Sequence, residues 1–255
     1  MSRTSFRLEN SDLGRGILVR MSAPSLRDRV REEITREIKA TARARLAQHG
    51  AGELSLRAVA RDLGLAPSAL YRYFPSRDAL LTALIIESYD SLADQVEETI
   101  SALPIDQFVA RWRAGWEAVR DWARDHPHEY ALIFGSPIPG YAAPSDTTTS
   151  GSRIPLLLLA LVRDARAAGA LSEQPLHHPL PDDAAAEANH LAAAIDLADI
   201  PGPILLRAVI AWSQLFGMVS FEVFGQLTGA FTDNTPFFTV ATDLMASFVG
   251  FQAEQ

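Results

Sequence analysis

Apolar residues in this chain recur at the spacing of an α-helix and show no sustained alternation with polar residues. The clearest pattern repeats every four residues along the first strong helix: Leu26, Val30, Ile34, Ile38, Ala42 and Leu46. Residues at this spacing share one face of a helix, whereas a half-buried strand requires a period of two. We therefore expect an all-α fold with essentially no β-sheet.

Residues that start and end helices divide residues 55–86 into three short helices. Ser55 is a suitable N-cap for the first, and Gly64 can adopt the left-handed backbone that closes it. Pro67 suits the first position of the second helix, because its missing N–H would have no partner there. Ser76 then caps the third helix. The first two helices and their tight turn form a helix-turn-helix signature, which predicts an N-terminal three-helix DNA-binding domain.

The second helix of this motif, residues 67–74, divides by face. Leu70 and Phe74 lie four residues apart and predict its buried side. The outer side and the adjoining helix starts are expected to contact DNA through Ser55, Pro67, Ser68, Ala69, Tyr71, Arg72, Tyr73, Ser76 and Arg77. Small residues allow close approach to the major groove, Tyr and Arg donate to phosphates, and Arg also reads guanine. Free N–H groups at a helix start favour a phosphate.

Charge is divided unevenly along the chain. Residues 1–86 hold 15 Lys and Arg against nine Asp and Glu, a net charge of +6. Residues 87–255 hold 8 against 22, a net −14, which together give the −8 of the whole chain. A basic binding module joined to an acidic domain has such a distribution, although composition drift along a neutral scaffold also produces it. We favour the first interpretation, because the basic part contains the helix-turn-helix.

Several classes of protein are disfavoured by what the sequence lacks. The absence of cysteine excludes disulfide frameworks and thiolate sites, and it suits a reducing cytoplasm. No Gly-x-Ser-x-Gly, Walker or Rossmann motif indicates an enzyme, and no His pair has the spacing of a zinc site, so we expect no catalysis, cofactor or metal. No signal peptide is evident, and the longest apolar uncharged run, Ala208 to Phe221, is too short to span a bilayer. We expect a cytoplasmic protein that does not enter a membrane.

The stretch LSLRAVARDLGLAPSALYRYFPSRDALLTAL, residues 54–84, strongly resembles the DNA-binding domain of TetR-type transcriptional repressors. The resemblance implies that Tyr71 and Tyr73 touch phosphates or bases and that Arg72 reads the groove. It also implies that Arg77 takes the place of a phosphate-binding lysine. The family fold adds a C-terminal helical domain that binds a ligand and dimerises.

Two residues at the front of the second helix depart from that family's pattern. Ala66 stands where a Ser or Thr often caps the helix, and Pro67 replaces a residue that often makes a polar contact. We therefore expect sequence specificity to depend mainly on Ser68 and Arg72. Further along the chain, residues 116–144 resemble a subclass of the regulatory domains of the same family.

The sequence thus predicts a flexible arm over residues 1–24, a DNA-binding domain over 25–86 and a helical effector-binding and dimerisation domain over 87–255. Within the last of these, residues 135–152 have the composition of a long loop. Aromatic residues at helical spacing are candidates for an effector pocket, although each one is more often core: Trp112, Trp116, Tyr130, Phe134, Trp212 and Phe216.

The segment 204–228 is apolar nearly all round, and 236–252 could pair with it. A helix that is apolar on two sides buries one side in its own domain and can bury the other in a partner, although both can also be intradomain core. We expect a homodimer interface at Leu205, Val209, Val219, Val223, Phe237, Leu244 and Phe248.

These observations lead to a functional hypothesis. We expect a dimeric repressor that binds a pseudo-palindromic double-stranded DNA operator and that an apolar or aromatic small molecule releases. An activator would use the same DNA contacts and stays open as an alternative. A further alternative is a helical ligand carrier or enzyme that keeps the helix-turn-helix only as packing.

Overall fold

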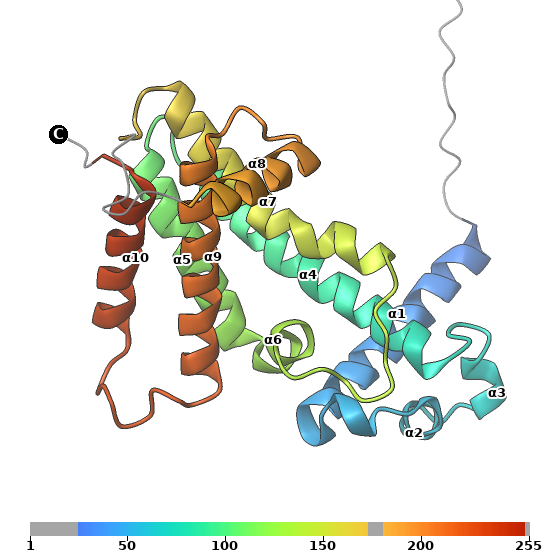
Figure 1. The fold of residues 1–255 in the computed structure, drawn as a ribbon. Helices are drawn as coiled ribbons and strands as arrows, with labels where there is room; N and C mark the ends of the chain where they lie inside the picture. Colours follow the sequence, from blue (N-terminus) through green and yellow to red (C-terminus); the bar gives the residue numbers. More distant parts are fainter. Residues whose placement is uncertain (1–24, 173–180, 253–255) are drawn as a thin grey trace, which may run out of the picture. The chain divides into compact units, whose positions relative to one another are not determined.

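The computed structural model describes residues 25–172 and 181–252, so the arm expected over residues 1–24 lies outside the described part. Ten α-helices and one 3₁₀ helix account for the regular structure of these residues, with no β-strand among them (Figure 1). This confirms the all-α prediction. The helices are α1 (Leu26–His49), η1 (Ala51–Glu53), α2 (Leu56–Asp62), α3 (Pro67–Leu70), α4 (Arg77–Ser101), α5 (Phe108–Asp125), α6 (Pro127–Phe134), α7 (Asp146–Ala167), α8 (Asp182–Ala194), α9 (Gly202–Val223) and α10 (Thr235–Val249).

The stretch up to Glu37 and the chain from Ile38 onward form two compact units. In the first unit, α1 begins with a reciprocal cap. The Ser25 backbone N–H donates to Asp28 Oδ2 at 3.1 Å, and the Asp28 N–H donates to Ser25 Oγ at 3.2 Å. Two donors that the first helical turn would otherwise leave open are thereby satisfied.

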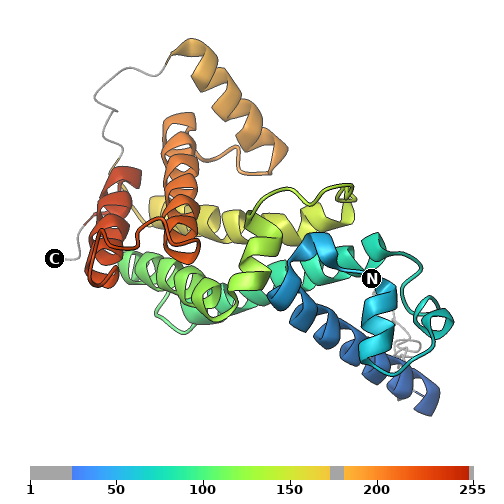
Figure 2. The same cartoon turned by 90° about the horizontal axis from the view of Figure 1, so that it is seen from below.

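In the second unit, the helix-turn-helix has its own small core. The buried apolar residues come from the second half of α1, from α2 and α3, and from the first half of α4. They include Ile38, Leu46, Val59, Leu70, Phe74, Leu80, Leu81 and Leu84. Figure 2 shows α2 and α3 against the start of α4. Leu70 and Phe74, the residues of this segment that were predicted to be buried, therefore pack into this core.

Helix α4 continues without a break from the helix-turn-helix into the C-terminal core (Figure 1). It contributes Leu80 and Leu84 to the first core and Leu92 and Val96 to the second. The domain boundary expected between residues 86 and 87 lies inside this helix. The change in charge at that point is not accompanied by a change in backbone, because the apolar spacing continues through it.

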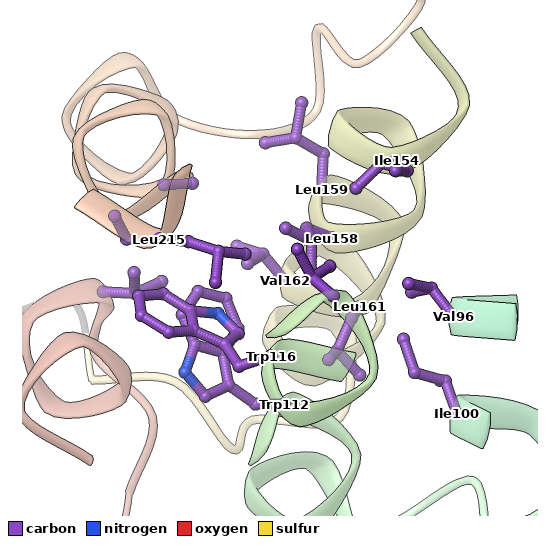
Figure 3. Close-up of a cluster of buried hydrophobic side chains, with 14 of the residues drawn as sticks. Val96, Ile100, Trp112, Trp116, Ile154, Leu158, Leu159, Leu161, Val162 and Leu215 are labelled. Carbon is purple, nitrogen blue, oxygen red and sulfur yellow. The ribbon is translucent and has the colours of Figure 1, made fainter. Parts of the chain in front are cut away.

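The C-terminal core is built around α5, which α4, α7, α9 and α10 surround. Figure 3 shows Trp112 and Trp116 of α5 beside Leu158 of α7 and Leu215 of α9. The two indole rings have centroids 5.2 Å apart, and both side chains are almost completely buried. Each large aromatic side chain buries more apolar area than an aliphatic one, so this pair is a major part of the core.

A buried ion pair ties α5 to α9. Arg120 Nε and Nη2 donate to the two carboxylate oxygens of Glu222 at 2.7 and 2.8 Å, and the guanidinium lies 5.0 Å from the Phe238 ring centroid. The hydrogen bond from Arg120 lowers the pKa of the Glu222 carboxyl, against the opposing effect of burial. The pair therefore stays ionised at neutral pH. Through its contacts with Glu222 and Phe238, Arg120 of α5 joins α9 and α10.

Two helices differ from the sequence expectation. Residues 135–152 were expected to be a loop, but α7 begins at Asp146. Thr147 and Ser150 are buried there, so tertiary packing overrides a composition that favours a loop. The second difference concerns α9. The sequence predicted a helix over residues 204–228, but α9 ends at Val223, and Gly225 follows it with φ of +79°.

Helix α9 passes the length and composition test for crossing a bilayer, because it extends beyond the run Ala208–Phe221 at both ends. Half of its most apolar window is buried inside the protein. The buried Arg207 and the Arg120 partner Glu222 also lie on it. These features are those of a core helix, which passes the same test.

Candidate DNA-binding surface

The turn between α2 and α3 has the geometry that the sequence predicts. Gly64 has φ of +66°, in the left-handed region that glycine adopts without strain. The Leu65 N–H donates to the Ala60 carbonyl at 2.9 Å, which closes α2. Pro67 occupies the first turn of α3, and Ala66 caps the helix without a side-chain hydrogen bond. The missing cap expected from Ala66 is therefore confirmed.

The recognition helix is shorter than the expected 67–74. Regular α-helix ends at Leu70, and the chain then tightens, with Tyr73 N–H donating to the Leu70 carbonyl at 2.9 Å. Arg72 N–H likewise donates to a carbonyl three residues earlier, that of Ala69, at 3.2 Å. Pro75 prevents the helix from continuing past Phe74, because a proline disfavours helical backbone in the residue before it.

The two faces of this segment are as predicted. Leu70 is completely buried and Phe74 is 8% exposed, whereas Tyr71 is 46% exposed. The remaining candidates lie on or near the open side: Pro67, Ser68 and Arg72 are exposed, and Ala69 and Tyr73 are half-buried. An exposed tyrosine and arginine on consecutive residues present two donors of the kind that phosphate oxygens accept.

Two serine-capped helix starts flank the recognition helix. Ser55 Oγ accepts the Ala58 N–H at 3.2 Å, and Ser76 Oγ accepts the Ala79 N–H at 3.0 Å. Both serines are exposed, and each hydroxyl keeps its own proton for donation. Each helix start also carries backbone N–H groups without a helical partner, which favour an anion.

The Arg77 side chain turns toward the protein. Its Nε donates to the Leu54 carbonyl at 3.0 Å, and Nη2 donates to that of Ala51 at 2.9 Å, with a longer bond to Gly52 at 3.4 Å. Its Nη1 lies 3.6 Å from Asp78 Oδ1. The guanidinium thus holds the connection between α1 and α2. The role implied by the family resemblance, a phosphate contact from this side chain, does not fit this geometry.

An exposed arginine that the sequence reasoning missed lies beside Ser55. Arg57 is in the first turn of α2, and it makes no hydrogen bond or ion pair with the described residues. Its position two residues after a predicted N-cap is the signal that could have found it, because side chains in a helix tilt toward the N-terminus, here the end beside the recognition helix.

Side-chain contacts join the helix-turn-helix region to α6 and the loop after it. Arg43 of α1 forms an ion pair with Glu87 of α4 at 2.5 Å and lies 3.6 Å from Glu129 of α6. The Thr82 and Tyr141 hydroxyls are hydrogen-bonded at 3.0 Å. A displacement of α6 or of this loop therefore changes contacts with α1 and α4, two helices that contribute buried residues to the helix-turn-helix core.

The candidate pocket aromatics separate into groups. Trp112 and Trp116 of α5 lie against one another with their ring planes tilted by 37°, and both are buried. Tyr130, Phe134 and Phe216 form a second group, in which the Phe134 and Phe216 centroids are 4.3 Å apart. The Tyr130 hydroxyl donates to the Phe216 carbonyl at 3.1 Å, and burial raises its pKa to about 12. Trp112, Trp116 and Tyr130 are buried in the core, whereas Phe134 and Phe216 are partly buried and pack against it.

Trp112 and Trp212 also meet at a small cavity between α5, α7 and α9, with a volume of about 30 Å³. The other four aromatic candidates do not line it. Tryptophans 100 residues apart in sequence therefore share one wall, and periodicity within a single helix could not have shown this pairing.

The structure corrects two of the expected dimer residues. Leu205 and Val219 are completely buried in the core of their own chain, so they are not available to a partner. Leu244 of α10 is 60% exposed. The others are half-buried: Val209, Val223, Phe237 and Phe248.

The exposed apolar face of α9 and α10 consists mainly of residues that the sequence analysis did not select. Ile210 and Phe221 of α9 are 45% and 54% exposed, and Val240 of α10 is 58% exposed, close to the exposure of Leu244. Gly217 lies between the first two in α9, and a side chain there would meet open space. On a helix that is apolar all round, sequence alone does not show which face the core takes.

Comparison with known proteins supports a regulatory role. The family model of bacterial regulatory proteins of the tetR family matches residues 38–84, and that of the tetracyclin repressor-like C-terminal domain matches residues 112–245. HTH-type transcriptional regulators Rv1816 of Mycobacterium tuberculosis and Mb1846 of Mycobacterium bovis are each 37% identical over 200 residues, 77% of this chain and 83% of theirs.

A solved structure agrees over most of the chain. The crystal structure of regulatory protein SCO4313 has a TM-score of 0.70 and 35% identity, and the match covers 88% of this chain and 100% of that one. Family members bind DNA operators as dimers and are not enzymes. The helix-turn-helix geometry, both family models and the curated relatives agree, and the chain belongs to the TetR family of DNA-binding transcriptional regulators.

Proposed function

We propose that this regulator is a cytoplasmic repressor that a small molecule releases from a pseudo-palindromic operator. The observation that carries the proposal is the open face of the recognition segment. Ser68, Tyr71 and Arg72 are exposed there, between the capped starts of α2 and α4. The basic N-terminal third of the sequence supports the same reading, because it favours a polyanion.

In this proposal the contacts divide by type. Pro67, Ser68 and Ala69 approach the major groove closely, and Arg72 reads a base edge. Tyr71 and Tyr73 donate to phosphates. The phosphate contacts of α2 and α4 come from Ser55 and Ser76 with their helix starts, and from the backbone N–H of Arg77 rather than its side chain.

We further propose that the face of α9 and α10 defined by Ile210, Phe221, Val240 and Leu244 forms the homodimer interface. Its support is the exposure of these large apolar side chains on two adjacent helices. Gly217 allows close approach of a second helix at the centre of the face. A two-fold dimer then presents two recognition helices about 34 Å apart, one helical turn of DNA.

The effector acts by binding one dimer arrangement more tightly than the arrangement that fits the operator. A swing from 1:99 to 99:1 requires about 5.5 kcal/mol of differential binding. The contacts of α6 and its following loop with Arg43 and Thr82 give a physical route from the C-terminal core to α3.

The test is a gel-shift titration on the DNA upstream of the protein's own gene. Arg72→Ala and Tyr71→Phe should weaken binding while helicity is unchanged, and Arg72→Ala should also relax the sequence preference at the base that it reads. As a matched control, Arg163→Ala removes a half-buried arginine of α7, outside the motif, and should leave binding intact. Undiminished binding by both recognition-segment variants would refute the assigned contacts.

A reporter gene fused to the same upstream DNA distinguishes repression from activation. Deletion of the regulator should raise transcription if it represses, and should lower it if it activates. Because both outcomes use the same DNA contacts, the gel-shift result does not depend on which one is found.

A further inference from the structure

A cavity outside the C-terminal core lies between η1 and α6, and we call it the η1–α6 cleft. The end of α1, η1, α6 and the loop that follows α6 supply the residues that line it. Its volume is about 290 Å³, against about 30 Å³ for the cavity beside Trp112. This volume is close to the lower end of the range for small-molecule sites, so a ligand can enter without displacing a wall.

The walls of the η1–α6 cleft are mainly apolar. Seven of the eleven residues that line it have hydrocarbon side chains, among them Leu46, Ala131, Leu132 and Ile138, and none of the eleven is Asp, Glu, Lys or Arg. A charged ligand would therefore lose its hydration there without gaining a permanent charge of opposite sign. The walls favour an uncharged, largely apolar molecule.

Two lining residues have polar side chains with hydrogen-bonding capacity to spare. His128 and Ser136 are exposed, and neither side chain makes a hydrogen bond with the described residues. A neutral imidazole donates from one ring nitrogen and accepts at the other, and a hydroxyl group does both. A ligand with one hydroxyl group can therefore bond to either residue. Apolar walls with a small number of polar groups are the usual composition of a small-molecule site.

The η1 wall of the cleft is held by the first residue of α4. Arg77 Nη2 donates to the carbonyls of Ala51 and Gly52 at 2.9 and 3.4 Å, and both of these residues line the cleft. Arg77 directly follows the Ser76 cap, which comes just after the recognition segment. A ligand that packs on this wall therefore touches the connection that Arg77 holds.

The opposite wall is restrained by different contacts. The pyrrolidine rings of Pro137 and Pro139 fix the backbone φ of these two lining residues. The same loop is joined to α4 by the hydrogen bond between the Tyr141 and Thr82 hydroxyls. Because walls that are ordered before binding lower the entropic cost of binding, the cleft is preorganised for a ligand.

We propose that the η1–α6 cleft binds an uncharged, mainly apolar small molecule that carries one hydroxyl or similar hydrogen-bonding group, and that Arg77 strengthens this binding by holding η1 in place. The site is separate from the C-terminal core, so it does not depend on an effector that binds there. Its occupant joins α6 to the connection between α1 and α2.

The test compares three fluorinated probes on the full-length protein by fluorine NMR titration. 4-Fluorophenol is neutral with one hydroxyl group, fluorobenzene has the same ring without it, and 4-fluorobenzoate is charged. We expect 4-fluorophenol to bind about fivefold more tightly than fluorobenzene, the effect of one hydrogen bond. 4-Fluorobenzoate should bind most weakly of the three.

Two variants locate the site by enlarging lining residues on opposite walls. Ala131→Leu adds volume on α6, and Gly52→Leu adds a side chain on η1, where a Cβ would meet open space. Each should weaken the binding of both neutral probes. Ala186→Leu on α8 is the matched control and should bind like the wild type, because Ala186 is exposed and does not line the cleft.

Two further variants test the chemistry. His128→Phe combined with Ser136→Ala removes both polar groups and keeps an aromatic ring, so the preference for 4-fluorophenol over fluorobenzene should disappear. Arg77→Met leaves every lining residue unchanged but frees η1, so 4-fluorophenol should bind more weakly while circular dichroism shows that the fold is retained.

The site is overturned if 4-fluorophenol does not saturate, if 4-fluorobenzoate binds best, or if folded Ala131→Leu and Gly52→Leu both bind like the wild type. Equal binding of fluorobenzene, or a preference that survives the loss of both polar groups, would exclude the hydrogen-bonding group. Undiminished binding by folded Arg77→Met would contradict the link to η1.

Discussion

Replacing Arg77 with methionine removes the guanidinium but keeps most of the aliphatic stem, so it tests which role this side chain has. In the structure the guanidinium donates to the carbonyls of Leu54 and Ala51 at 3.0 and 2.9 Å. A hydrogen bond from a charged donor contributes about 1.5–3 kcal/mol, but water replaces part of this for a side chain that is 27% exposed. At about 1 kcal/mol for each bond, Arg77→Met should lower the free energy of unfolding by about 2 kcal/mol.

Arg77→Lys separates charge from geometry. Lysine keeps the positive charge that a phosphate senses, but its single ammonium does not reproduce the fork that reaches both carbonyls. We expect this variant to lose about 1 kcal/mol of the free energy of unfolding. Urea unfolding followed by circular dichroism, at one fixed protein concentration, measures both variants against the wild type.

DNA binding is then measured over a series of salt concentrations. Since the guanidinium faces carbonyls, the slope of log K against log salt should be unchanged in Arg77→Met. If the side chain instead neutralised a phosphate, the slope would fall by about 0.9 per subunit, or about 1.8 for a dimer. That fall, with an unchanged free energy of unfolding, would refute the reasoning. Arg57→Met is the matched control and should show the opposite: a smaller slope and unchanged stability.

Further predictions concern other parts of the chain. Glu222→Gln leaves Arg120 buried without its carboxylate and should lower the free energy of unfolding at pH 7 by about 3 kcal/mol, measured with urea. Because the folded-state pKa of Glu222 is lowered, this contribution is present above the unfolded pKa of about 4.3 and is lost as pH falls through the folded value. A wild-type-to-variant difference that stays constant across that range would contradict it. Leu244→Glu places a charge on the exposed face of α10 and should shift sedimentation toward the monomer, whereas Ile105→Glu, at a 73% exposed site between α4 and α5, should not. Ala66→Ser supplies the missing cap of α3 and should raise the free energy of unfolding by about 1 kcal/mol. The absence of any gain would show that the start of α3 is already satisfied.

The helix-turn-helix was readable from the sequence because local chemistry determines it. Gly64, Pro67 and the two serine caps specify turns and helix starts through their own backbone preferences. Leu70 and Phe74 report the buried face through spacing alone. Pro75 likewise marks the point that the helical segment cannot pass, since it restricts the residue before it.

Features that depend on distant residues were not readable in the same way. The three carbonyls bound by Arg77 lie 23 to 26 residues earlier in the chain, so the family position of this residue suggested a phosphate contact instead. Likewise, α9 is apolar on every side, and only the packed structure shows that Leu205 faces inward while Ile210 faces outward. The cavity shared by Trp112 and Trp212 is a third case of this kind.

The continuity of α4 has a mechanical consequence. Its 25 residues form a rod about 37 Å long that begins one residue after the Ser76 cap and ends in the C-terminal core. If the far end acts as a pivot, a tilt of about 5° carries the near end through about 3 Å, a distance comparable to the length of a hydrogen bond. A rearrangement too small to disturb the packing of the core is therefore magnified into one large enough to take a side chain out of reach of a base edge.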